Sequence, residues 1–268
     1  MTQTLRDAIG NRHSPADKSP RIACLVPSLT ELLFDLGLER QLVARTSFCI
    51  HPADRVFRLA SVGGTKKIKH RELRALAPTH GILNIDENPR AMYEELRQYV
   101  PHIIVTHPQT PYDNPPLYRL LGNIFHRQTE AEALTRRFEE NLAQLTRTVE
   151  GLPRRRVLYL IWKKPWMGVA PGTYIANTLK LIHWQVLPEA KDPPYPQLEM
   201  TRELLEEAEL ILFSSEPFPF KEADLDEFAQ QQQVDRTRLK RVDGELTSWY
   251  GSRAIPGLAY LGRLARQV

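Results

Sequence analysis

Apolar residues recur between residues 128 and 149 with the period of an α-helix. They are separated by steps of three or four residues and form one stripe: Ala131, Leu134, Phe138, Leu142, Leu145 and Val149. Residues at these steps share one side of a helix, while the charged residues between them occupy the other sides. At about 1.5 Å per residue the helix would be roughly 33 Å long, the width of a small domain. The pattern predicts one long amphipathic helix over 128–149.

Short apolar runs alternate with helical patterns on both sides of this helix. The runs read as buried strands at 21–26, 42–46, 81–85, 102–106, 156–162, 209–215 and 239–243. The helical patterns cover 70–77, 89–99, 173–183, 201–208 and 221–233, and a last helix begins near Ser252. Ser28 stands three residues before Glu31, which predicts a capping box at the start of a further helix that Gly37 ends. The proline-rich stretch 107–116 is expected to be a loop.

Strands that alternate with helices predict an α/β fold with mainly parallel sheets. We expect two α/β lobes joined by one long, rigid helix: an N-terminal lobe at 21–127, the helix at 128–150 and a C-terminal lobe at 151–268. Ligands of open α/β sheets bind beyond the carboxyl ends of the strands. A ligand cleft between the two lobes is therefore expected.

The richest strand end is the sequence DGELTSWYGSR at 243–253. Trp249 and Tyr250 are expected to wall the cleft, with Gly251 permitting close approach and Arg253 reaching a ligand carboxylate or amide oxygen. In the alternative interpretation one ring packs under the last helix and Arg253 pairs with a nearby acid.

Two other strand ends are aromatic. Trp162 and Trp166 flank a proline, and we expect one indole to cover the second sheet and the other to face the cleft. Phe218 and Phe220 alternate with prolines, which predicts a stiff platform. Glu216, beside them, either bonds a ligand or caps the following segment.

Other chemistry is poorly represented. Gly64, in VGGTKK, is assigned to close approach of a ligand or to a tight turn, because the phosphate-loop motif is not met. The eight histidines do not occur at metal-binding spacings, and only His51, close to Cys49, is a candidate metal-binding side chain. No metal site is predicted. No nucleophile elbow is present either, so no catalytic residue is assigned.

Composition and charge narrow the location and partners. Lys and Arg number 36 and Asp and Glu 32, a mild surplus of +4 that does not indicate nucleic-acid binding. No apolar run is long enough for membrane insertion. Residues 1–20 contain no apolar stretch of the kind found in signal peptides, which predicts residence in the cytoplasm, or in the periplasm if a leader was removed.

The whole pattern resembles the cobalamin-binding-protein-like branch of the helical-backbone metal receptor superfamily. These are the ABC-transporter substrate-binding proteins for vitamin B12, iron-siderophores and haem. The resemblance runs from about Arg21 to about Leu261 and rests on RIACLVPSLTELLFDLG, VGGTKK, the 128–149 helix, LYLIWKKPWM, SSEPFPFKE and DGELTSWYGSR.

This resemblance implies a non-enzymatic receptor whose cleft closes only slightly on a bulky ligand, such as cobalamin or another metal chelate, that is not needed for folding. The expected ligand-binding residues are Ser28, Glu31, Gly64, Trp162, Trp166, Glu216, Phe218, Trp249, Tyr250 and Arg253. An ABC permease is the implied partner, contacted through Glu72 and through Glu203 or Glu206. The alternative is a cytoplasmic enzyme or metallochaperone that reuses the fold. Its acid–base candidates are Glu31, His51, Glu87, Glu216 and Asp243.

Overall fold

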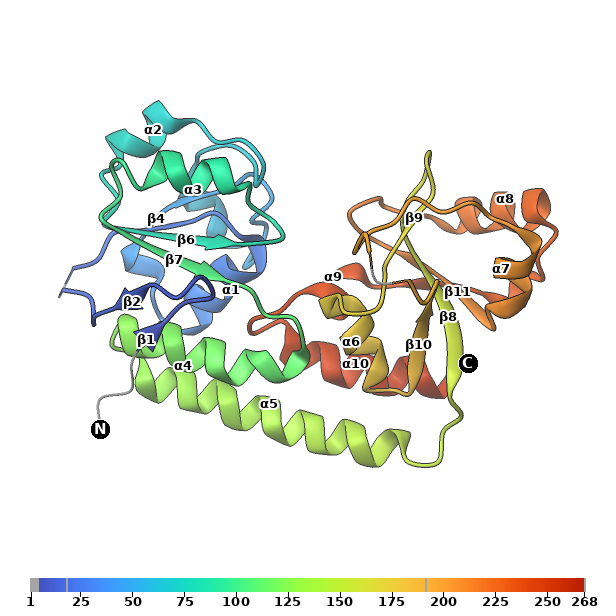
Figure 1. Cartoon of the computed structure of the whole chain (residues 1–268). Coiled ribbons are helices and arrows are strands. Elements are labelled where there is room, and N and C mark those ends of the chain that lie inside the picture. Colours follow the sequence, from blue (N-terminus) through green and yellow to red (C-terminus); the bar gives the residue numbers. More distant parts are fainter. Residues whose placement is uncertain (1–4, 18, 191, 268) are drawn as a thin grey trace. The chain divides into compact units, whose positions relative to one another are not determined.

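The computed structural model describes residues 5–17, 19–190 and 192–267 (Figure 1). Residues 1–4 and 18 of the stretch 1–20 therefore lie outside the described ranges. The chain forms two compact units. Unit 1 contains the residues up to Pro108, Tyr112–Phe138 and the short segment Tyr250–Arg253. Unit 2 contains Gln109–Pro111, Glu139–Trp249 and the residues from Ala254 onward.

Unit 1 is built on a parallel sheet with strand order β5-β4-β3-β6-β7. Its strands are β3 (Ile22–Cys24), β4 (Leu42–Arg45), β5 (Ala60–Ser61), β6 (His80–Asn84) and β7 (His102–Thr106). Its helices are α1 (Pro27–Asp35), α2 (His70–Ala75), α3 (Arg90–Leu96) and α4 (Asn114–Ile124). Short 3₁₀ turns occur at η1 (Glu39–Gln41), η2 (Val56–Arg58) and η3 (Pro111–Asp113).

One face of this sheet is covered by α2 and α3, and α1 and α4 lie on the other side (Figure 1). Leu73 of α2 and Met92 and Leu96 of α3 pack with Leu83 and Val105 of the strands in one apolar cluster. The β-α order of the sequence is therefore matched by a helix-covered parallel sheet, as the alternation of apolar runs predicts.

The long helix is present as α5, Gln128–Val149, with the bounds that the apolar stripe predicts. Ala131, Leu134, Phe138, Leu145 and Val149 are buried, and Leu142 is half-buried. The first half of α5 belongs to unit 1 and the second half, from Glu139, to unit 2. The periodicity alone was enough to place this element.

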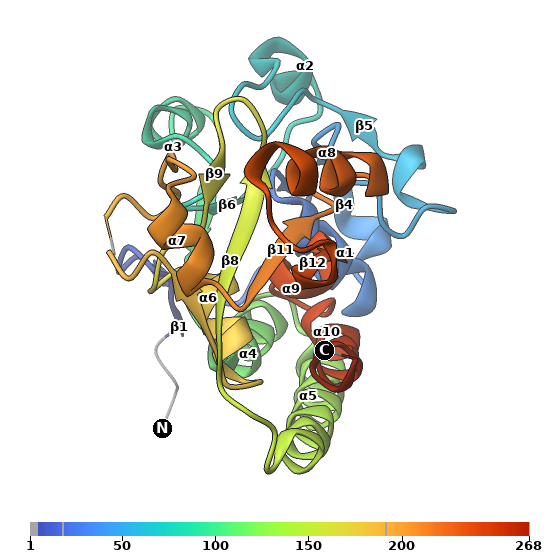
Figure 2. The ribbon, with the colours of Figure 1, turned by 90° about the vertical axis from the view of Figure 1, so that its right-hand side faces the viewer.

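Unit 2 contains a second sheet of order β10-β8-β11-β12, all parallel, with β9 antiparallel to β8 (Figure 2). Its strands are β8 (Arg155–Trp162), β9 (Met167–Gly168), β10 (Trp184–Leu187), β11 (Leu210–Ser214) and β12 (Leu239–Val242). Its helices are α6 (Tyr174–Lys180), α7 (Arg202–Glu207), α8 (Glu222–Gln232), α9 (Gly244–Ser248) and α10 (Ala254–Arg266), with the 3₁₀ turn η4 (Arg236–Arg238). The α/β prediction is confirmed.

Two local predictions are wrong. Ser28 does not cap α1, because the helix begins one residue earlier at Pro27 and Val26 is the capping position, without a side-chain bond. The loop predicted over 107–116 ends early, since Asn114 begins α4 and prolines are tolerated in a first helical turn. The segment 243–253 contains a short helix that the sequence did not indicate, since Asp243 accepts a bond from the Leu246 amide and caps α9.

Among the helices of the described ranges, none combines the length and the apolar character that crossing a membrane requires.

A small hairpin, β1 (Leu5–Arg6) and β2 (Arg12–His13), is bonded to the edge strand β7. Ala8 donates its amide to the Val105 carbonyl at 2.9 Å. The buried carboxylate of Asp7 accepts from the backbone amides of Ile9, Asn11 and Val105 at 2.9–3.1 Å. Burial by itself raises the pKa of Asp7, but its bonds to His13 and to these amides outweigh burial and hold the pKa below its usual value.

We expect the substitution Asp7→Asn to destabilise the protein by about 1–3 kcal/mol, because the amide side chain turns a donor toward buried backbone donors. The native stabilisation is present above the unfolded pKa of about 3.9 and is lost as the pH falls through the lower folded pKa. The gap in unfolding free energy between the parent and the variant should therefore narrow only below about pH 4. Urea denaturation at several pH values measures this difference in unfolding free energy. Asp17→Asn, at an exposed position, is the control and should leave the unfolding free energy nearly unchanged. If the difference between the parent and Asp7→Asn is already shrinking at neutral pH, the Asp7 carboxylate does not stabilise the hairpin in this way.

Candidate functional site

The carboxyl ends of the strands of unit 1 carry loops that contact one another. Asn88, after β6, donates its side-chain amide to the carbonyls of Leu25 and Thr65 at 3.1 and 2.9 Å. Lys66 donates to the Asp86 carbonyl at 2.9 Å. The loops 46–50, 62–68 and 85–88, together with 250–253, are called the unit 1 face below.

The segment Tyr250–Arg253 is anchored to α4 through the backbone of Gly251. The Gly251 amide donates to Asn114 Oδ1 at 2.7 Å, and the Gly251 carbonyl accepts from the Tyr118 hydroxyl at 2.8 Å. Gly251 has φ +83°, and a Cβ there would lie 3.2 Å from the Ser28 carbonyl oxygen. The glycine therefore lets the segment approach α1, whereas the sequence suggested an approach to a ligand.

Tyr250 is buried and its hydroxyl donates to Glu87 Oε1 at 2.6 Å. Burial raises the pKa of the Tyr250 phenol well above its ordinary value, and the charge and hydrogen bond of Glu87 raise it further. Ser28 is also buried here, on α1. Tyr250 is thus a neutral donor that fixes Glu87, and its ring is largely withdrawn from solvent.

Arg253 makes a two-pronged ion pair with Glu31, from Nη2 to Oε1 at 2.6 Å and from Nε to Oε2 at 2.9 Å. Both side chains are less than a fifth exposed, at 18% and 16%. Burial raises the pKa of Glu31, opposed by its bond to Arg253 and by the nearby charges of Arg253 and His51. The alternative in which Arg253 pairs with an acid is the one that the structure contains.

In unit 2 the indole of Trp249 donates to Glu216 Oε1 at 2.6 Å, and the Ser248 hydroxyl lies 3.1 Å from the same oxygen. Burial raises the pKa of Glu216, opposed by the bond from Trp249. Trp249 also borders a void of about 10 Å³ among Tyr174 of α6 and Leu258 and Leu261 of α10. The interpretation that one ring packs under the last helix applies to Trp249.

The two tryptophans of the loop after β8 have different surroundings. Trp166 stacks on Phe220 at 6.1 Å between ring centres and contacts the apolar cluster of the second sheet. Trp162 remains 40% exposed and meets Phe218 edge-on at 5.6 Å. One indole therefore covers the sheet as expected, and Trp162 and Phe218 form an aromatic step at the strand end.

Exposed apolar side chains also occur on the unit 1 face. Phe48 is 60% and Ile50 40% exposed, both on the loop after β4. A Cβ on Gly64 would lie 3.2 Å from the Phe48 ring, so Gly64 supports this ring. The Gly64 amide donates to the Lys67 carbonyl at 2.8 Å, which makes the segment a tight turn.

The predicted site residues therefore fall into two sets, each within one unit. Unit 1 holds Ser28, Glu31, Gly64, Tyr250 and Arg253, and unit 2 holds Trp162, Trp166, Glu216, Phe218 and Trp249. Sequence reasoning missed Phe48 and Ile50, as well as Asn114 and Tyr118, which hold the Gly251 backbone. For Phe48 and Ile50 the available signal in the sequence was two large apolar residues directly after a predicted strand.

Metal-binding groups do not gather in the described ranges, where no cluster of three His, Cys, Asp or Glu side chains could hold an ion. The Cys49 thiol, next to His51 in sequence, lies 3.1 Å from the Thr30 hydroxyl and 3.2 Å from the Thr46 hydroxyl. Burial raises the pKa of this thiol.

We expect Trp249→Ala to cost about 2 kcal/mol or more of folding free energy, because it removes a half-buried ring and the donor that Glu216 uses. Trp162→Ala, which removes an exposed ring, should cost less than about 1 kcal/mol. Chemical denaturation of the two variants measures the difference. Equal costs for both would show that Trp249 is not part of the packed interior.

The comparisons with known proteins agree with this architecture. The model of the family described as periplasmic binding protein matches residues 22–237. A vitamin B12-binding protein of Pectobacterium carotovorum subsp. carotovorum (strain PC1) is 23% identical over 199 residues, which cover 74% of this chain and 72% of that protein.

Two solved structures have the same fold. The periplasmic vitamin B12-binding protein of Vibrio cholerae superposes with a TM-score of 0.80 at 18% identity, covering 93% of this chain and 99% of that one. The periplasmic haem-binding protein of Roseiflexus sp. RS-1 gives a TM-score of 0.80 at 18% identity, covering 93% and 98%. The resemblance inferred from the sequence is confirmed.

The prediction of a cytoplasmic location is wrong. The matched family consists of periplasmic binding proteins, and both solved structures are of periplasmic proteins. That prediction rested on the polar composition of residues 1–20, and a missing apolar stretch carries no positive information about location.

The family model covers the sheet of unit 1, the whole of α5 and the second sheet except β12, so the match includes most of the elements that define the fold. This chain belongs to the periplasmic binding protein family.

Proposed function

We propose that this protein is a non-enzymatic receptor for a flat, bulky metal chelate, with a corrinoid as the first candidate. The observation that carries the proposal is the exposure of large apolar side chains beside strand ends in both units, Phe48 at 60% and Trp162 at 40%. Covering such rings with an apolar ligand surface contributes about 25 cal/mol per Å². The vitamin B12-binding relative supports the choice of ligand class.

A second candidate is haem, favoured by the solved haem-binding structure of the same fold and by His51. His51 lies on the loop that carries Phe48 and Ile50, close to Glu31. Imidazole is a common axial ligand of haem iron. A haem complex would therefore be expected to depend on His51, whereas the proposed corrinoid complex relies on the aromatic rings.

The engagement of the acidic residues supports binding rather than turnover. Glu31 is paired with Arg253, Glu87 accepts from Tyr250, and Glu216 accepts from Trp249. Asp243 caps α9. A general acid or base must reach its substrate's proton, and these carboxylates are held by neighbours of their own chain.

An ABC permease is the partner that we propose, contacted through acidic residues of each unit. Glu203 on α7 is exposed and makes no ion pair with a described residue, whereas Glu206 is bonded to Arg202 at 2.7 Å. Glu203 is therefore the better candidate in unit 2. In unit 1 Glu72 is exposed, 4.0 Å from Lys69 Nζ.

Titration of the full chain with cyanocobalamin and with hemin, followed by quenching of tryptophan fluorescence, tests the proposal. We expect saturable binding of one of the two. Phe48→Ala and Trp162→Ala should each weaken it by about tenfold, since loss of ring contact is worth about 1.4 kcal/mol or more. Phe57→Ala, which removes an equally exposed ring on η2, is the matched control.

The variants also separate the hypotheses. If His51→Ala abolishes hemin binding and leaves cyanocobalamin binding unchanged, haem is the ligand that the site coordinates. The expectation from the resemblance that one ligand touches both lobes stays a prediction, and it requires both aromatic variants to weaken the same ligand. Absence of saturable binding to either compound would contradict the metal-chelate proposal.

A further inference from the structure

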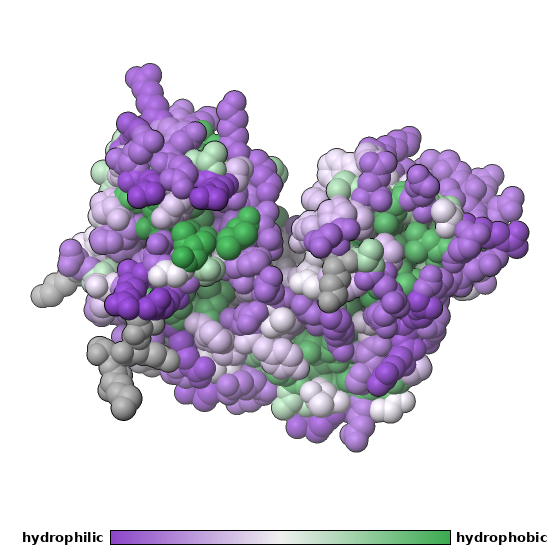
Figure 3. Space-filling view, viewed as in Figure 1, coloured by the Kyte–Doolittle hydropathy of each residue, from purple (hydrophilic) through white to green (hydrophobic). Residues whose placement is uncertain are grey.

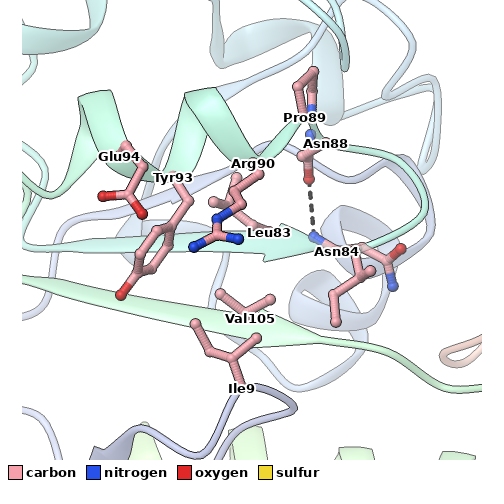
Figure 4. Close-up of a pocket in the computed structure, with 10 residues that line it drawn as sticks. Ile9, Leu83, Asn84, Asn88, Pro89, Arg90, Tyr93, Glu94 and Val105 are labelled. Atoms are coloured by element: carbon pink, nitrogen blue, oxygen red, sulfur yellow. Dashed lines mark hydrogen bonds between the residues drawn. The ribbon is translucent and has the colours of Figure 1, made fainter.

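Unit 1 contains a cavity of about 350 Å³ that lies beside α3. Leu83 and Val105 form its floor on neighbouring strands, and Arg90, Tyr93 and Pro89 border it from α3 and the residue before it (Figure 4). Its volume falls within the range typical of small-molecule sites. It is separate from Phe48, Glu31 and Tyr250, none of which borders it.

The walls of the cavity are mainly apolar. Leu83 and Val105 pair in register, and both belong to the apolar cluster under α3. Ile9 closes the cavity from the tip of the N-terminal hairpin and is still 47% exposed. Apolar surface gathers in this part of unit 1, over the ends of β6 and β7 (Figure 3), where Ile85 is also 43% exposed.

The backbone at Ile9 is held by hydrogen bonds within unit 1. The Ile9 amide donates to Asp7 Oδ1 at 3.1 Å, and Asp7 Oδ2 accepts from the Val105 amide at 3.0 Å. The same carboxylate thus ties the hairpin tip to the strand that forms the floor. An apolar wall held in this way is preorganised for contact with a ligand.

One cation of the cavity lacks a partner within the described ranges. Arg90 points from the start of α3 toward the strands, between Tyr93 and Asn84 (Figure 4), and no described residue forms an ion pair or hydrogen bond with it. The neighbouring Glu94 is bonded to Arg97 at 3.3 Å. Because the charges of Glu94 and Arg97 offset each other, the guanidinium of Arg90 is the charge at the edge of the cavity that is not balanced by an ion pair with a described residue.

We propose that this cavity binds a small monocarboxylate with a compact apolar body. At about 30 Å³ per water the cavity has room for roughly twelve waters, and so for a ligand of on the order of ten non-hydrogen atoms. The apolar body contacts Ile9, Leu83 and Val105, and the carboxylate pairs with the planar guanidinium of Arg90. The cavity shares Ile85 and Asn88 with the unit 1 face, but it uses none of the side chains that carry the metal-chelate proposal, Phe48, His51 and Trp162.

Benzoate and its neutral isostere benzamide are the probes, followed by methyl NMR of the full chain at Ile9, Leu83 and Val105. We expect benzoate to shift these methyl signals saturably and to bind about tenfold more tightly than benzamide. Arg90→Gln should remove this preference by weakening benzoate alone about tenfold. Ile9→Ala should weaken both probes, because it removes a shared apolar contact.

Arg71→Gln, an exposed arginine on α2, is the control with the same charge change and should alter neither probe. Saturating benzoate should leave the titrations with cyanocobalamin and hemin unchanged, which separates this site from the proposed receptor function. Equal affinity for benzoate and benzamide, an unchanged Arg90→Gln variant, or unmoved signals at the three residues would each overturn the proposal.

Discussion

The anchoring of Tyr250–Arg253 is the constraint on which the strand-end loops of unit 1 depend. Gly251 uses its amide and its carbonyl on Asn114 and Tyr118, and Arg253 pairs with Glu31, which is 222 residues away in sequence. Tyr250 fixes Glu87 in the loop after β6. Displacing this segment would leave several buried groups unpaired at about 1–3 kcal/mol each. One short segment therefore fixes α1, α4 and the loop after β6 relative to one another.

The same bonds decide what remains for recognition. The carboxylates and the arginine that the sequence offered as ligand contacts already have partners inside their own unit. The accessible groups are apolar side chains such as Phe48 and Trp162. Apolar burial is non-directional and scales with area, so it suits broad, flat ligands better than small polar ones. In such a receptor the polar side chains hold the loops in place, and the exposed aromatic rings supply the affinity for the ligand.

Local signals predicted the fold well and the site in part. The apolar stripe placed α5 because helix periodicity is set by residues three and four apart. The capping box at Ser28 failed because Pro27 already fits the first helical position. The helix from Asn114 was missed because its opening prolines resemble a loop. The partners of Gly251 lie more than a hundred residues away, so no local pattern indicates them.

The neighbours Trp249 and Tyr250 show why aromatic motifs are ambiguous in sequence. They belong to different units, and each places its polar atom 2.6 Å from a carboxylate, Glu216 or Glu87. The exposed Trp162 has no hydrogen-bond partner for its indole within the described ranges. A ring whose polar atom is satisfied by its own chain is fixed as scaffold, while a ring without such a bond can turn its face and its donor to a ligand. The local sequence around a scaffold ring and around a ligand-binding ring can look alike. What separates them is whether a carboxylate from a distant part of the chain accepts a hydrogen bond from the ring.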